Sequence, residues 1–213
     1  MAVDINGSAL AKLESRIRAC RICVESPYKT ALPHEPRPVL RVSMTARLLV
    51  ASQAPGIRVH ETGLSFNDAS GDRLRQWMGV SREVFYDRAK VAIVPMGFCF
   101  PGHDLHKGDL PPRRECRGHW HDKLFAALPQ ISLILAIGRY AINYHFACLE
   151  RPLPKNLPSG EIIRRWRDFA GSTPRLLVLP HPSWRNNAWL KCNPWFEEEL
   201  LPVVRAEVAA AIS

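Results

Sequence analysis

Residues 46–71 have the sequence ARLLVASQAPGIRVHETGLSFNDASG. The apolar run at the start is too short for a typical helix and ends at Pro55 and Gly56, which favours a strand buried on both faces. Such strands belong to parallel sheets, and ligands bind outside the carboxyl ends of the strands in open α/β sheets. An ordinary connecting loop would carry the same Pro-Gly turn. The candidate site residues in this loop are Gln53, Phe66, Asn67 and Asp68.

Length and composition favour a globular protein. The chain has 213 residues and an apolar fraction of 46%, so it can bury a full core, and we expect a single domain over residues 1–213. The N-terminal sequence lacks the pattern of a signal peptide, and no run reaches the roughly 18 apolar residues of a membrane span. We therefore expect a cytoplasmic monomer with no membrane partner.

The charge balance is strongly basic. Lys and Arg outnumber Asp and Glu by 29 to 20, which gives a formal net charge of +9. A basic surface favours polyanions because each neutralised phosphate releases condensed counterions. Nucleic acid is therefore the first partner to consider, and a solvated basic face without a partner is the alternative.

The rest of the chain predicts buried strands that alternate with helices. Further strands are expected at about 90–95, 132–137 and 175–179. Helices are expected at about 8–18, 71–79, 120–128, 139–149 and 194–210. The prolines of 151–158 indicate a loop, and residues 184–191 are expected to form an aromatic and basic loop. This alternation predicts an α/β fold, a three-layer α/β/α sandwich around a four-stranded parallel sheet.

The cysteines form a second pattern. In a reducing compartment a disulfide framework is unexpected, so metal binding, catalysis or burial must explain them. A helix and a Cys-x2-Cys knuckle occupy about residues 8–24, but one such pair is half a metal site, and two buried thiols would explain it equally well. The irregular segment 96–116 has a cysteine near each end, and long irregular segments are usually functional or disordered. The six cysteines are Cys20, Cys23, Cys99, Cys116, Cys148 and Cys192.

From Cys20 to about Pro194 the motifs resemble the uracil-DNA glycosylase superfamily, most closely its iron-sulfur branches, the fourth and fifth families. The matching pieces are Cys-x2-Cys, a strand that ends in Ala-Pro-Gly, a Thr-Gly-x2-Phe loop, two cysteines around a long loop, a Gly-Arg turn and a late His-x-Ser. His181-Pro-Ser183 is similar to the fourth family, whereas Asp68-Ala-Ser-Gly71 is similar to the fifth. The chain is thus intermediate between the two.

The resemblance implies a uracil-DNA glycosylase that hydrolyses the N-glycosidic bond of uracil in DNA and leaves an abasic site for base excision repair. His181 would donate a hydrogen bond to the base oxygen O2 as negative charge builds, and Asp68 would orient a water and stabilise the cationic sugar. No lysine stands in the motif segments to form a Schiff base, so the enzyme is expected to be monofunctional. A core histidine and a helix N-cap are the alternative interpretations of these two residues.

Such an enzyme must flip its target base out of the duplex and hold it. Phe66 would stack on the base and Asn67 would bond its edge, although a core aromatic and a turn asparagine are ordinary alternatives. The expected substrate contacts are Gln53, Ala54, Gly56, Phe66, Asn67 and Ser183. Cations on the phosphates and an apolar wedge in the gap would grip the duplex. The expected DNA contacts are Trp184, Arg185, Asn187 and Lys191.

The resemblance also implies a [4Fe-4S] cluster, for which four thiolates are the usual ligands. The expected ligands are Cys20, Cys23, Cys99 and Cys116. A structural zinc is the alternative, because zinc also accepts four thiolates. The cluster would fix the long loop and hold Arg113, Arg114 and Arg117 toward DNA. Cys148 and Cys192 fall outside the pattern.

Two positions depart from the family. Pro95 stands where the fourth family has an asparagine that binds the uracil edge, and Gln53 aligns with an acidic residue that crowds the 5-position of the base. These departures leave open how thymine is excluded. They also motivate a second hypothesis, a non-catalytic or weakly catalytic binder of uracil-containing or abasic DNA. A more distant alternative is a metal-dependent nucleotide hydrolase with zinc on its cysteines.

Overall fold

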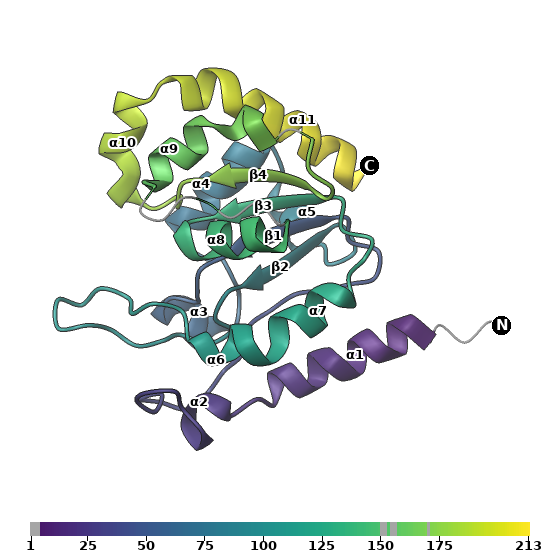
Figure 1. The fold of residues 1–213 in the computed structure, drawn as a ribbon, viewed down its shortest axis with the longest axis vertical. Helices are drawn as coiled ribbons and strands as arrows, with labels where there is room; N and C mark the ends of the chain where they lie inside the picture. The colour runs from purple at the N-terminus through teal and green to yellow at the C-terminus, as the bar shows by residue number, and fades with distance from the viewer. Residues whose placement is uncertain (1–4, 150–152, 154–156, 170) are drawn as a thin grey trace.

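The computed structural model describes residues 5–149, 153, 157–169 and 171–213. Four parallel strands form the central sheet in the order β2-β1-β3-β4, which confirms the predicted sheet (Figure 1). Val50 is level with Ile93 on one side and with Leu135 on the other. All residues of the first three strands are buried, as expected for a sheet covered on both faces. The strands are β1 Leu48–Ser52, β2 Val91–Pro95, β3 Leu133–Ile137 and β4 Arg175–Leu179.

Helices cover both faces of this sheet and complete the predicted three-layer sandwich (Figure 1). On one face α4 (Ala69–Met78) and α11 (Leu201–Ile212) contact each other. On the other face α7 (Asp122–Ala126) meets α8 (Arg139–Cys148), where the Tyr144 hydroxyl donates to Asp122 at 2.8 Å. The parallel sheet therefore exposes only its edges and the loops at its strand ends.

The remaining helical segments are short. Helical structure starts at Arg114, ahead of the predicted start at 120, and runs through a π-helical stretch into α7. The N-terminal helix starts at Ile5, and two short helices in the 46–90 region escaped prediction. The predicted loop at 151–158 lies mostly outside the described residues. No described helix is long and apolar enough to span a bilayer. The segments are α1 Ile5–Arg18, α2 Ile22–Glu25, α3 Ile57–Thr62, α5 Arg82–Tyr86, α6 Arg114–Cys116, α9 Ser159–Arg164 and α10 Asn187–Cys192, with π-helical stretches at Arg117–His121 and Phe196–Leu200 and 3-10 turns at Trp166–Phe169 and Trp184–Asn186.

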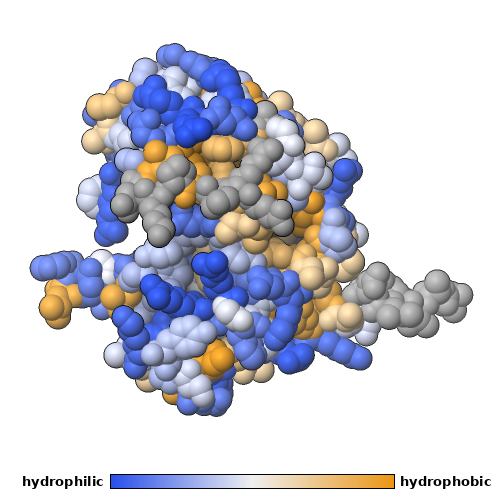
Figure 2. Space-filling model, viewed as in Figure 1, coloured by the Kyte–Doolittle hydropathy of each residue, from blue (hydrophilic) through white to orange (hydrophobic). Residues whose placement is uncertain are grey.

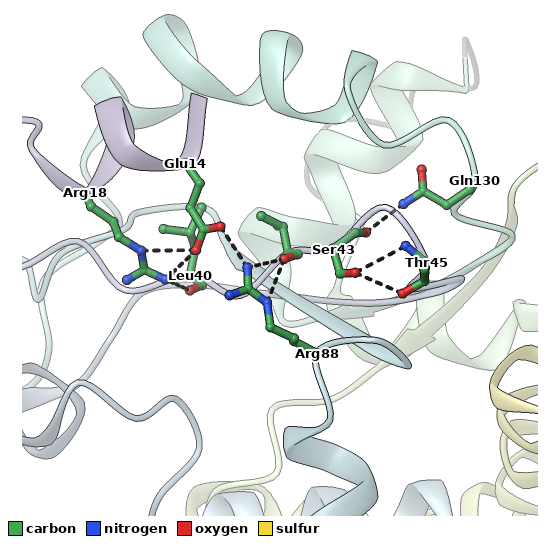
Figure 3. A network of polar contacts seen from close by, with 8 residues as sticks. Glu14, Arg18, Leu40, Ser43, Thr45, Arg88 and Gln130 are labelled. Carbon is green, nitrogen blue, oxygen red and sulfur yellow. Dashed lines mark hydrogen bonds and ion pairs between the residues drawn. The ribbon is translucent and has the colours of Figure 1, made fainter. Parts of the chain in front are cut away.

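A polar network fastens α1 to the edge of the sheet (Figure 3). The Glu14 carboxylate pairs with Arg18 at 2.6 Å and with Arg88 at 2.8 Å. The two guanidinium groups also donate to the carbonyl oxygens of Leu40 and Val42, at 2.8 and 2.6 Å. These carbonyls belong to the segment that runs along β2, so the network sets where the first two cysteines lie.

Candidate active site

A cleft of about 110 Å³ lies at the carboxyl ends of the strands. Its walls come from the loops that follow β1 and β4, from the last residue of β2 and from the loop that precedes α4. The structure therefore brings together residues far apart in sequence at the edge where open α/β sheets bind ligands. The predicted site residues that line this cleft are Gln53, Ala54, Gly56, Phe66, Asp68 and His181.

A second cavity, of about 140 Å³, lies at the β2 edge and is lined by Arg18, Arg41 and Arg88. Its guanidinium groups already have partners, since two pair with Glu14 and Arg41 donates to the Tyr86 carbonyl at 2.6 Å. Among the described residues, its walls offer no carboxylate, imidazole or thiol. This cavity lacks the acid and base groups that the chemistry needs, so we assign the site to the strand-end cleft.

Asp68 is both a helix N-cap and a residue of the cleft, the two positions that the sequence allowed for it. It is the N-cap of α4, and its Oδ1 accepts the Gly71 N–H at 2.9 Å. It also lines the cleft. A carboxylate has two oxygens and about four lone pairs, so one capping bond leaves acceptors for a water or a sugar. The cap holds the side chain at the mouth of the helix, beside the ligand space.

Phe66 stands in a strained turn. Its φ of 57° is in the left-handed region, which is rare for a bulky residue and costs of order 1–3 kcal/mol. Its carbonyl accepts from the buried Arg75 at 3.3 Å, and its ring meets the edge of Phe85 with centroids 5.9 Å apart. The Tyr86 hydroxyl donates to the preceding carbonyl, of Ser65, at 2.8 Å. These contacts hold the aromatic ring against the cleft despite the strain.

Gly71 is required by this turn, because a Cβ there would lie 1.7 Å from the Phe66 carbonyl oxygen. Gly71→Ala should therefore displace the Phe66 turn and destabilise the fold by about 1–3 kcal/mol, as overpacking does. Gly63→Ala is the matched control: its φ is 70° but nothing lies within 4 Å, so only the left-handed strain of about 1–2 kcal/mol applies. Denaturant melts measure the stability of each variant, and release of free base from uracil-containing DNA, the activity that the sequence leads us to expect, reports whether the cleft keeps its shape. Equal loss of base release in both variants would contradict the role of the close approach.

His181 follows β4 and is presented as a neutral donor. Its Nδ1 accepts the Ser183 N–H at 3.2 Å, so in the neutral ring the proton is on Nε2. Burial lowers the pKa of His181 below its usual value, and the opposing influence of Asp68 and Asp109 is smaller. Asn186 donates to the His181 carbonyl at 2.6 Å and fixes the backbone. Ser183 does not line the cleft, so it acts here through its amide.

Gln53 lies across the end of β3, which separates β1 from β4. Gly138, the first residue after β3, has φ 78°, and a Cβ there would come within 2.9 Å of the Gln53 side chain. Because Gly138 has no side chain, the Gln53 carboxamide fits between the loops that follow β1 and β4. Pro95 lines the cleft as well and presents no polar side-chain group to a base edge.

Two residues differ from expectation. Asn67 does not line the cleft, because its Oδ1 accepts from Arg82 at 3.0 Å. Asp109, which the sequence did not single out, lines it and lies 3.3 Å from the His103 Nε2. It comes from the irregular segment between the third and fourth cysteines, and no sequence pattern shows that this segment returns to the cleft.

The segment predicted as an aromatic and basic loop is instead helical, a 3-10 turn followed by α10. The Trp189 ring packs against Trp195 and Phe196 with centroids 5.9 and 5.8 Å apart, and this packing stabilises a helix that is too short to be stable alone. Trp184 is 73% exposed and is the tryptophan that faces solvent. Arg73 holds the segment by donating to the Asn187 Oδ1 at 2.8 Å. Arg185 and Lys191 are exposed beside it.

The four predicted cysteine ligands lie close together. The Cys116 thiol donates to the Cys23 sulfur, which lowers the pKa of Cys23 to about 7. Burial raises the pKa of Cys99 to about 12, and the nearby sulfurs of Cys23 and Cys20 add to the shift. The Trp120 indole donates to the Cys20 sulfur at 3.2 Å. Cys148 and Cys192 are exposed and lie apart from this group.

The arginines beside the fourth cysteine do not all face outward. Arg113 pairs with the buried Glu115 at 2.9 Å and donates to the Thr30 carbonyl, so the expectation that it points toward DNA is wrong. The Arg117 guanidinium lies 5.3 Å from the Tyr144 ring. Arg114 is exposed. Arg113 instead fastens the segment after the first cysteine pair to the segment that holds the last one.

Comparison with known protein families agrees with this geometry. The model of the family described as the uracil DNA glycosylase superfamily matches residues 41–205. The matched span contains all four strands and every residue that lines the cleft, whereas Cys20 and Cys23 precede it. The match covers well over half of the chain, and the protein therefore belongs to the uracil DNA glycosylase superfamily.

Proposed function

We propose that this protein is a monofunctional glycosylase that hydrolyses the N-glycosidic bond of uracil in DNA and leaves an abasic site. Membership of the superfamily supports glycosylase chemistry on DNA. The observation that carries the proposal is the meeting of Asp68 and His181, from two distant loops, in one cleft at the sheet edge.

The chemistry requires opposite charges to be placed on either side of the bond that breaks. As the C1′–N1 bond lengthens, the sugar becomes oxocarbenium-like and the base becomes anionic. The free oxygen of Asp68 accepts a hydrogen bond from the attacking water, and its negative charge stabilises the cationic sugar. The Nε2–H of His181 donates to the base oxygen O2. The water oxygen then bonds to C1′ and gives its proton to the Asp68 carboxylate, while the base leaves as an anion with the electrons of the C1′–N1 bond.

The lining of the cleft supports water as the nucleophile. No lysine is among the lining residues of the described chain, so no amine is placed to form a Schiff base with C1′. The ring of Phe66 offers a face or edge against which an everted base can stack. The exposed Trp184, with Arg185 and Lys191, would contact the duplex from α10 and the turn before it.

Base release is the direct test. Purified protein is incubated with oligonucleotides that contain uracil or hypoxanthine, and the free base and the abasic sites are quantified. Free uracil is expected, with strand breaks appearing only after alkali treatment. Strand breaks without alkali would contradict a monofunctional enzyme, and undiminished release after the combined loss of Asp68 and His181 would contradict the site.

A specific observation favours a second candidate, a binder of uracil-containing or abasic DNA with little turnover. Pro95 has no side-chain donor or acceptor for the base edge, and the position of Gln53 in the cleft lacks a carboxylate. Tight stoichiometric binding of uracil-containing DNA with no detectable free base would support this candidate over the first.

We further propose that the four gathered cysteines hold a [4Fe-4S] cluster and that the protein is a member of the iron-sulfur branches. The donors suit it: four thiols, with the Trp120 indole and the Phe98 amide donating to two of the sulfurs. A structural zinc is the alternative, because zinc also accepts four thiolates. Among the described residues no three Cys, His, Asp or Glu side chains are placed as a ready metal site, so the thiols would have to shift to bind either group. The cluster would supply structural support to the segments that carry its ligands.

Cys99→Ser should remove the broad visible absorption of the purified protein and most of its iron, because it deletes a buried ligand. Cys192→Ser is the matched control, since this thiol is exposed and outside the group. Iron and sulfide analysis with a visible spectrum gives the readout. A colourless wild-type protein that contains zinc would contradict the cluster.

A further inference from the structure

Residues 102–110 form a closed hairpin that projects from the molecule between β2 and α6 (Figure 1). The Leu110 N–H donates to the Gly102 carbonyl at 2.9 Å, and His103 bridges Asp109 across the two arms. At the tip, the Asp104 Oδ1 accepts two backbone N–H groups, of residues 106 and 108, both at 2.8 Å. The hairpin is therefore shaped by its own hydrogen bonds rather than by contact with the core.

The tip presents an apolar side chain to solvent. Leu105 is 99% exposed, and Figure 2 shows a hydrophobic patch at the end of the projection. The Asp104 carboxylate caps the tip amides, whereas Asp109 stands at the base of the hairpin, 3.3 Å from His103 and in the wall of the cleft. The exposed Lys107 follows the leucine closely. An apolar tip with an adjacent cation suits a polyanion with an apolar interior.

The base of the hairpin belongs to the wall of the cleft. Asp109 lines it together with His181, and Trp184 follows His181 by three residues. Two highly exposed apolar side chains, Leu105 and Trp184, thus project from two separate elements that wall the same cleft. One element follows β2 and the other follows β4, so their attachments lie at opposite sides of the sheet.

We propose that the 102–110 hairpin is a second duplex wedge, which inserts Leu105 beside the everted nucleotide while Trp184 enters from the other element. This rests on the proposed function in taking DNA as the partner. Everting a nucleotide unstacks its neighbours, and an apolar wedge offsets that loss by filling the gap. Leu105 has its whole side chain available for burial, and the preformed hairpin loses little conformational freedom on binding. Lys107 would then lie at a phosphate.

The test compares double-stranded with single-stranded substrate, because only a duplex has a gap to fill. Leu105→Ala should lower base release from duplex DNA by at least about tenfold, the factor that one buried leucine side chain can supply. The loss on the single strand should be much smaller. Leu110→Ala is the control, since this residue is on the same hairpin but at its base. Its ratio of duplex to single-strand activity should match wild type. Because Leu105 is fully exposed, its replacement is not expected to affect folding.

A binding readout separates this proposal from the proposed catalysis. A 2-aminopurine placed next to the uracil in a duplex should brighten on addition of wild-type protein and brighten less with Leu105→Ala. This holds even if no base is released. Equal loss of activity on duplex and single strand, or an unchanged fluorescence response, would overturn the wedge.

Discussion

His181→Ala should lower the rate of uracil release by about 10²–10³-fold, the cost of removing one positioned donor to developing negative charge. The loss should fall on kcat rather than KM, because the hydrogen bond strengthens only as the base becomes anionic. Single-turnover kinetics on a uracil-containing duplex measures it. A change confined to KM would contradict the assignment and leave His181 as a binding group.

The pH profile gives a second readout of the same residue. Burial lowers the pKa of His181 below 6.5, so the ring stays neutral in the folded protein at neutral pH. The neutral form accepts from the Ser183 amide, and protonation of Nδ1 would break that bond. The rate should therefore be flat above pH 6.5 and fall only as the pH drops through the depressed pKa. The His181→Ala variant should lack this fall. A rate that rises on acidification would contradict the neutral donor.

Asp68→Asn should lower base release by about 10²–10³-fold, since it removes the negative charge that faces the cationic sugar. Stability should be nearly unchanged, because asparagine caps helices as well as aspartate does. Asp68→Ala should be as slow and should also lose about 1 kcal/mol through the missing cap. For a chain of this size that loss lowers the melting temperature by roughly 2–4 °C.

The pair of variants separates the observed capping role of Asp68 from its proposed catalytic role. If Asp68→Asn retained full activity while Asp68→Ala lost stability, the residue would be a cap alone. If Asp68→Asn were both slow and unstable, the capping bond at Gly71 would need the charge. Calorimetry and single-turnover kinetics on the same samples distinguish these outcomes.

The sheet could be predicted because its strands are buried on both faces and so carry continuous apolar runs between turn residues. Asp68 and His181 could be predicted as site residues, because His181 directly follows a predicted strand and Asp68 follows the Thr-Gly-x2-Phe motif. α10 could not, since its helical state depends on the packing of Trp189 against Trp195 and Phe196. Asp109 could not either, because its place in the cleft depends on how an irregular segment returns. Single-domain organisation, a monomeric state and a cytoplasmic location stay predictions.

The position of the cysteines has a consequence for control of the enzyme. None of the described residues before Ser52 lines the cleft, yet residues 5–40 supply half of the gathered thiols. The other half flank the segment that delivers Asp109 and the projecting hairpin. If these thiols hold the proposed cluster, an agent that extracts iron or alkylates sulfur would touch no reacting atom. We expect it to slow the proposed reaction from a distance, by freeing the segment that carries Asp109 at one side of the cleft.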